Sequence, residues 1–187
     1  MTKATRNGLV LAVAQVALVA SLGGKLLADR ATYPRVWIQT APVDPRLPIR
    51  GRYVRLRVDA SIGPDLTLLP AQRYVDGTGR AWMPEAPPQA VQLAVEDDRL
   101  VAHASSDIEA VRAHAAVRDG RTVAQLIDPL AYFIPERVPD PSRRPPGETL
   151  WVEVTVPRRG PPRPIRLGVM KDGVLEPIVY AGSVSPN

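Results

Sequence analysis

Cysteine is absent from all 187 residues of the chain. Without a thiol there is no cysteine nucleophile, no thiolate zinc site, no c-type haem attachment and no lipidated cysteine at the N-terminus. Disulfides are excluded as well, so a folded domain of this chain must be stabilised by its own hydrophobic core.

Histidine, lysine and phenylalanine are scarce: the chain has two, three and one of them. The two histidines, His103 and His114, lie on separate predicted elements, which is a poor pattern for a metal site. Lys171 lies in a predicted Lys-Asp-Gly turn, where a solvated lysine keeps its proton and cannot activate a serine. No glycine-rich nucleotide-binding pattern occurs. We therefore predict no catalytic residue, no metal, no cofactor and no enzymatic activity.

Arginine is abundant, but its distribution does not favour nucleic-acid binding. Residues 1–30 hold four basic residues and one acidic residue, so they contribute +3 of the net charge of +5. The remaining +2 is small for a nucleic-acid surface. We predict no nucleic-acid partner.

One long apolar run is present, at Gly8–Leu27, and its first 17 residues carry no formal charge. About 20 apolar residues in a helix cross the hydrocarbon core of a bilayer. Lys3 and Arg6 precede the run, and the positive-inside rule then keeps the N-terminus in the cytoplasm. We predict a single-pass anchor in the bacterial inner membrane, with the C-terminal domain outside the cytoplasm. A signal peptide cleaved near Val19-Ala20-Ser21 and a buried core helix are the alternatives.

The remaining chain divides into a proline-containing stalk at 31–49, with a possible short strand at 36–38, and a β-rich domain at 50–187. Its 21 prolines favour short elements and rigid connections. In the stretch RGRYVRLRV, residues 50–58, apolar and polar side chains alternate as in a half-buried strand. The predicted core-facing residues are Val54, Leu56 and Val58, and the outward ones are Tyr53, Arg55 and Arg57.

Further strands are predicted at 66–75, 80–83, 91–95, 100–103, 150–156, 165–170 and 174–179, and the apolar segment 130–134 is predicted to be buried. Turn signals separate several of them, including Asp76–Gly79 and Asp172-Gly173. Residues 107–117 fit either a capped helix or part of a hairpin that turns at Asp119-Gly120, and the hairpin is favoured. About ten short strands predict a mainly β fold: one N-terminal transmembrane helix followed by an antiparallel β-barrel or β-sandwich-like domain.

Three residues of the first predicted strand, Gly51, Tyr53 and Leu56, resemble the signature of the bacterial GDYXXLXY family. Arg52 replaces the aspartate of that signature, and Val58 replaces its final tyrosine. The segment YFIPE, residues 132–136, is similar to an aromatic-aromatic-x-x-Glu segment of the family. The resemblance implies a membrane-associated protein. Because members are linked with multi-span membrane proteins, it also implies a membrane partner.

The hypothesis that we favour is an accessory protein of the cell envelope that acts by contact with a multi-span membrane protein. Its candidate contact surface consists of Tyr53, Arg55, Arg57, Arg143, Arg144, Arg158 and Arg159. Glu136 is interpreted as a partner for Arg55 or Arg57. The alternatives are a tethered envelope hydrolase with a carboxylate site that includes Glu136, and a domain that binds a small ligand.

Overall fold

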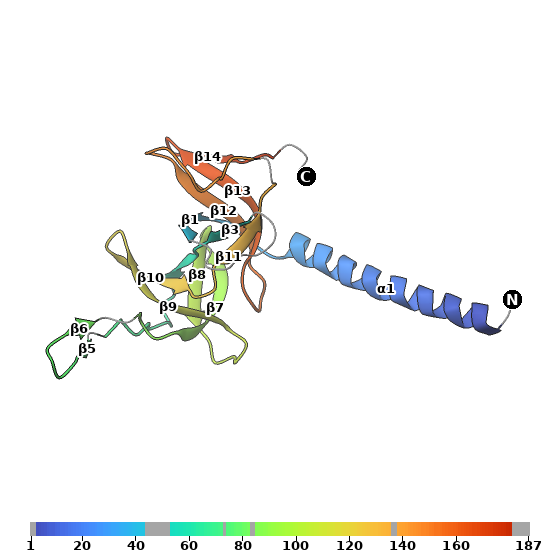
Figure 1. The fold of residues 1–187 in the computed structure, drawn as a ribbon, viewed down its shortest axis with the longest axis horizontal. Helices are drawn as coiled ribbons and strands as arrows, with labels where there is room; N and C mark the ends of the chain where they lie inside the picture. The colour runs from blue at the N-terminus through green and yellow to red at the C-terminus, as the bar shows by residue number, and fades with distance from the viewer. Residues whose placement is uncertain (1–2, 44–52, 73, 83–84, 136–137, 181–187) are drawn as a thin grey trace. The chain divides into compact units, whose positions relative to one another are not determined.

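The computed structural model describes residues 3–43, 53–72, 74–82, 85–135 and 138–180 (Figure 1). The chain forms two units, Met1–Tyr33 and Pro34–Asn187. The first is a single helix, α1, at Lys3–Thr32. No proline interrupts it, and it ends shortly before Pro34, which disfavours helical conformation at the residue before it.

Helix α1 is long and apolar enough to cross a membrane. Its stretch Asn7–Lys25 has a mean hydropathy of 1.7, and none of it is buried inside the protein. Leu11, Val16 and Leu18 are 61–70% exposed. A helix of this length and apolar composition, with none of its apolar stretch buried, is suited to contact with lipid.

The second unit is mostly β. An open sheet has the order β1-β12-β13-β14, and all of its neighbours are antiparallel. Its strands are β1 (Arg35–Thr40), β12 (Thr149–Thr155), β13 (Arg163–Lys171) and β14 (Val174–Pro177). The short strand predicted at 36–38 is thus confirmed as part of β1. Part of the segment predicted as a stalk therefore lies in this sheet.

Five further strands follow one another in a ring of pairings, in the order β10-β4-β8-β7-β9, and β9 pairs with β10 again. They are β4 (Asp59–Ile62), β7 (Gln89–Glu96), β8 (Arg99–Ala104), β9 (Val111–Arg118) and β10 (Arg121–Leu126). Two of the joins, β10–β4 and β4–β8, consist of two residue pairs each. The β4–β8 join is parallel, whereas the sequence predicted antiparallel strands throughout.

Two small sheets complete the unit. The first has the order β11-β3-β2, and the second pairs β5 with β6. Their strands are β2 (Pro42–Val43), β3 (Tyr53–Leu56), β5 (Tyr74–Val75), β6 (Ala81–Trp82) and β11 (Leu130–Phe133). The mainly β fold class is confirmed.

The predicted hairpins are confirmed where a turn signal marks them. Asp119 and Gly120 connect β9 and β10 with φ values of 47° and 75°, so residues 111–117 are strand and not helix. Asp172 and Gly173 connect β13 and β14 in the same way. Positive φ at both central residues gives the turn whose twist matches that of paired strands.

The strand predicted at 66–75 is wrong for most of its length, because among the described residues of this segment only Tyr74–Val75 forms a strand. The chain turns instead at Gly63, whose N–H donates to Ala102 O at 2.8 Å and whose carbonyl accepts from Leu66 N. Pro64 and Pro70 lack the N–H that a ladder requires. Leu66 is buried, so it packs in the core although it is not part of a strand.

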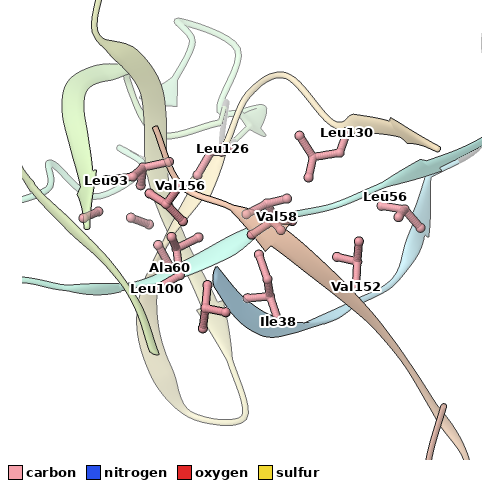
Figure 2. Packing of buried hydrophobic residues seen from close by; sticks show 14 of the residues in the cluster. Ile38, Leu56, Val58, Ala60, Leu93, Leu100, Leu126, Leu130, Val152 and Val156 are labelled. Atoms are coloured by element: carbon pink, nitrogen blue, oxygen red, sulfur yellow. The ribbon is translucent and has the colours of Figure 1, made fainter. Parts of the chain in front are cut away.

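One hydrophobic core joins strands of the three larger sheets (Figure 2). Figure 2 labels Ile38, Leu56, Val58, Ala60, Leu93, Leu100, Leu126, Leu130, Val152 and Val156. Leu56, Val58 and Ala60 are fully buried, so the chain from β3 to β4 keeps one face in the core while it passes between two sheets. Burying one such valine or leucine contributes about 1.5–3 kcal/mol.

Candidate functional site

The outward row of β3 is the first part of the candidate site. Val54 and Leu56 are buried, and Tyr53, Arg55 and Arg57 are half-buried on the opposite face. The predicted alternation is therefore confirmed. Of the three signature residues, Leu56 is a core residue, Tyr53 faces outward, and Gly51 lies outside the described residues, as do Arg52 and Glu136.

Strand β11 extends this row with an aromatic side chain. Phe133 lies opposite Tyr53 in the register, and the two ring centroids are 6.2 Å apart with a tilt of 54°. The Phe133 side chain is nevertheless 70% exposed, although it is the single phenylalanine of the chain. We call Tyr53, Arg55, Arg57 and Phe133 the β3 face.

A hollow of about 290 Å³ adjoins the arginines of the β3 face. It is lined by Val43, Arg55, Arg57, Glu85, His114, Gln125, Leu126, Ile127 and Pro129, and we call it the β3 hollow. Its polar side chains come from strands far apart in sequence. His114 on β9 lies opposite Gln125 on β10, and Gln125 lies opposite Asp59 on β4. The register therefore continues the outward row of β3 onto the ring of five strands.

An ion-pair network supports the arginine side of the hollow. Arg118 Nε donates to Asp59 Oδ2 at 3.1 Å, and the Arg118 guanidinium also donates to Gln125 Oε1. Arg57 Nε lies 3.4 Å from the same Asp59 oxygen, without the geometry of a hydrogen bond. One carboxylate is thus shared by two guanidinium groups.

Two hydrogen bonds hold the backbone of Arg57 in place. Its N–H donates to Ala41 O at 3.0 Å, and its carbonyl accepts from Thr40 Oγ1 at 2.5 Å. The Arg55 backbone pairs with β11 and β2, but its side chain makes no ion pair or hydrogen bond within the part of the chain that the structure describes. The arrangement therefore presents a surplus of positive charge beside an exposed aromatic ring.

The four loop arginines of the predicted contact surface do not line the β3 hollow. Arg144 pairs with Glu148 at 3.8 Å, and Arg143 is exposed in the same loop. Arg159 pairs with Asp107 at 3.6 Å, and Arg158 lines a second hollow of about 260 Å³. The structure thus groups Tyr53, Arg55 and Arg57 and leaves the other four arginines in two separate loops.

Sequence reasoning missed a histidine that bridges two carboxylates. His103 Nδ1 lies 2.7 Å from Asp65 Oδ1, and its Nε2 lies 2.8 Å from Glu96 Oε1. The bond to Asp65 raises the pKa of His103; partial burial opposes this effect and the bond to Glu96 adds to it, so the net shift is upward. Asp65 and His103 are 38 residues apart, and only the parallel pairing of β4 and β8 brings them together. Within the described ranges, no three acidic or histidine side chains are arranged to hold a metal ion.

Glu153 is a second acid whose surroundings the structure defines. It lies on β12, opposite Arg166 of β13. It is buried, and its Oε2 accepts from Arg166 Nε at 2.6 Å. Arg166 also lies over the Trp37 ring, 5.3 Å from its centroid. The ion pair therefore joins two neighbouring strands, and the burial of Val152 and Glu153 shows that both faces of β12 are covered here.

The protein is thus a mostly β protein with one N-terminal apolar helix that is long enough to span a membrane. Its β unit carries a basic and aromatic face. The chain belongs to the GDYXXLXY family, whose family model, described as GDYXXLXY protein, matches residues 15–167. The described parts of the two segments that carried the resemblance pair with each other, with Tyr132 opposite Val54 and Phe133 opposite Tyr53. No curated protein and no solved structure matches the chain significantly.

Proposed function

We propose that the protein is an accessory protein of the bacterial cell envelope that acts by contact and not by catalysis. In this proposal α1 remains uncleaved as a single-pass anchor in the inner membrane, with the β-rich unit outside the cytoplasm. The unit contacts a multi-span membrane protein through the β3 face. Lys3 and Arg6, which precede the apolar stretch of α1, support this orientation.

The observation that carries the proposal is the exposure of Phe133 beside arginines. Burial of a phenylalanine side chain contributes about 1.5–3 kcal/mol, yet Phe133 is exposed. Its exposure therefore supports a surface that a partner protein covers. Aromatic residues and arginine are the types that are enriched in protein–protein interfaces. Tyr53, Arg55 and Arg57 supply the rest of such a patch on one strand and its extension.

Photo-crosslinking in cells tests this contact. A photoreactive amino acid at position 133 should crosslink the full chain to a multi-span membrane protein, which mass spectrometry identifies. The same amino acid at Val117, a 66% exposed valine at the tip of the β9–β10 hairpin, is the matched control and should give no such product.

A companion variant tests the charge. Arg55→Glu should reduce the crosslink from position 133, because it reverses the charge next to the ring without removing any ion pair among the described residues. Equal products from positions 117 and 133, or a monomer that purifies in mild detergent with no enriched membrane protein, would contradict the proposal.

A further inference from the structure

We infer that the β3 hollow is a binding site for a phosphate group. The inference concerns a ligand and does not rest on the protein partner proposed above. The three basic side chains that line the hollow, Arg55, Arg57 and His114, can donate hydrogen bonds to an anion. They come from β3, its extension and β9, so they approach the hollow from different elements.

The donors are not satisfied within the described part of the chain. The Arg55 side chain makes no ion pair or hydrogen bond there. Arg57 Nε is buried and makes no hydrogen bond, even though Asp59 Oδ2 lies 3.4 Å away. The hydrogen bonding of the Arg57 guanidinium is thus incomplete, and an anion in the hollow would add acceptors for the guanidinium groups of Arg55 and Arg57.

The surrounding charges favour an anion. Arg118 donates to both Asp59 and Gln125, and Arg57 lies beside the same Asp59 carboxylate. Two arginines therefore share the charge of Asp59. Glu85 is the acidic side chain that lines the hollow. The three positive charges of Arg55, Arg57 and Arg118 therefore exceed the two negative charges of Asp59 and Glu85.

The geometry of the donors selects phosphate over a carboxylate. Arginine forks bind both groups in a bidentate manner. A carboxylate offers two oxygens in one plane, whereas a phosphate offers oxygens in several directions. Donors from three strand segments around a hollow of about 290 Å³ are matched better by a tetrahedral group. The group can belong to a free phosphate or to the headgroup of an anionic phospholipid.

Calorimetric titration of the full chain in neutral detergent micelles tests the inference. Two probes are titrated at constant ionic strength. One is inorganic phosphate, and the other is glycerophosphoglycerol, the phosphodiester headgroup without acyl chains. Binding of either probe supports the site. Tighter binding of inorganic phosphate identifies a free phosphate as the source, and tighter binding of the phosphodiester identifies a lipid headgroup.

Variants link the binding to the hollow. Arg55→Gln should weaken the affinity about tenfold or more, because it removes a charge-assisted donor. Arg57→Lys keeps the charge and loses the fork, so it should also weaken binding. Arg80→Gln, an exposed arginine in the β5–β6 hairpin, is the matched control and should bind like the original chain. Circular dichroism verifies that each variant is folded.

Two outcomes would overturn the inference. One is that neither probe binds to the folded chain. The other is that Arg55→Gln and Arg80→Gln weaken the affinity equally, because binding would then reflect net charge and not this site.

Discussion

Gly168 on β13 lies close against the Trp37 ring of β1. A Cβ at this position would lie 2.8 Å from Cζ3 of Trp37 and 3.2 Å from Glu176 O. The Trp37 ring cannot move away freely, because Arg166 lies over it and is itself bound to the buried Glu153. Because Gly168 has no Cβ, the Trp37 ring can pack directly on β13.

We predict that Gly168→Ala lowers the free energy of unfolding by about 1–3 kcal/mol, the usual cost of inserting a methyl group into a packed site. Urea denaturation followed by tryptophan fluorescence measures the change. Gly77→Ala is the control, because a Cβ at Gly77 meets no atom within 4 Å. If the two variants unfold at the same urea concentration, the close approach of Trp37 has no energetic weight.

At the scale of elements, His103 on β8 connects the segment after β4 to the end of β7 through its two carboxylate partners. These contacts lie beside the parallel join of β4 and β8, which has only two residue pairs. Side-chain bonds thus reinforce a place where backbone pairing is short. They require a proton on each ring nitrogen, so the reinforcement depends on pH.

We predict that the protein loses stability as the pH rises above 6.5. The pKa of His103 is raised from 6.5 in the folded state, so its contribution is complete below that value and disappears as the pH rises through the folded pKa. Urea denaturation at a series of pH values measures this. His103→Gln should remove this part of the pH dependence, and His114→Gln should retain it. An unchanged pH dependence in His103→Gln would refute the linkage.

Local patterns predicted the elements better than their assembly. Asp119-Gly120 and Asp172-Gly173 specify their hairpins through turn chemistry within a few residues. The parallel pairing of β4 with β8 leaves no such local signal, because it depends on packing across the core. The same distinction applies to the site: alternation placed Arg55 and Arg57 outward, but His114 and Gln125 reach the hollow only through tertiary register.

At the scale of the whole molecule, α1 forms one unit and the β-rich chain another. We predict that the mature protein keeps α1, so that alkaline extraction leaves it in the membrane fraction. Intact-mass measurement of the purified protein should then include residues 1–30. A mature chain that begins near Ser21 would instead identify a cleaved signal peptide.

The pairing of β1 with β12 has a consequence for the order in which the chain folds. Thr40 pairs with Leu150 and Arg35 with Thr155, so 110 to 120 residues separate the partners. β1 lies at the edge of its sheet and has β12 as its neighbour. As the chain emerges N-terminus first, β1 must therefore wait for nearly the whole sequence before its ladder forms. Closing such a long loop is slow. Until it closes, β1, which follows α1 in the sequence, exposes its unpaired backbone to other chains.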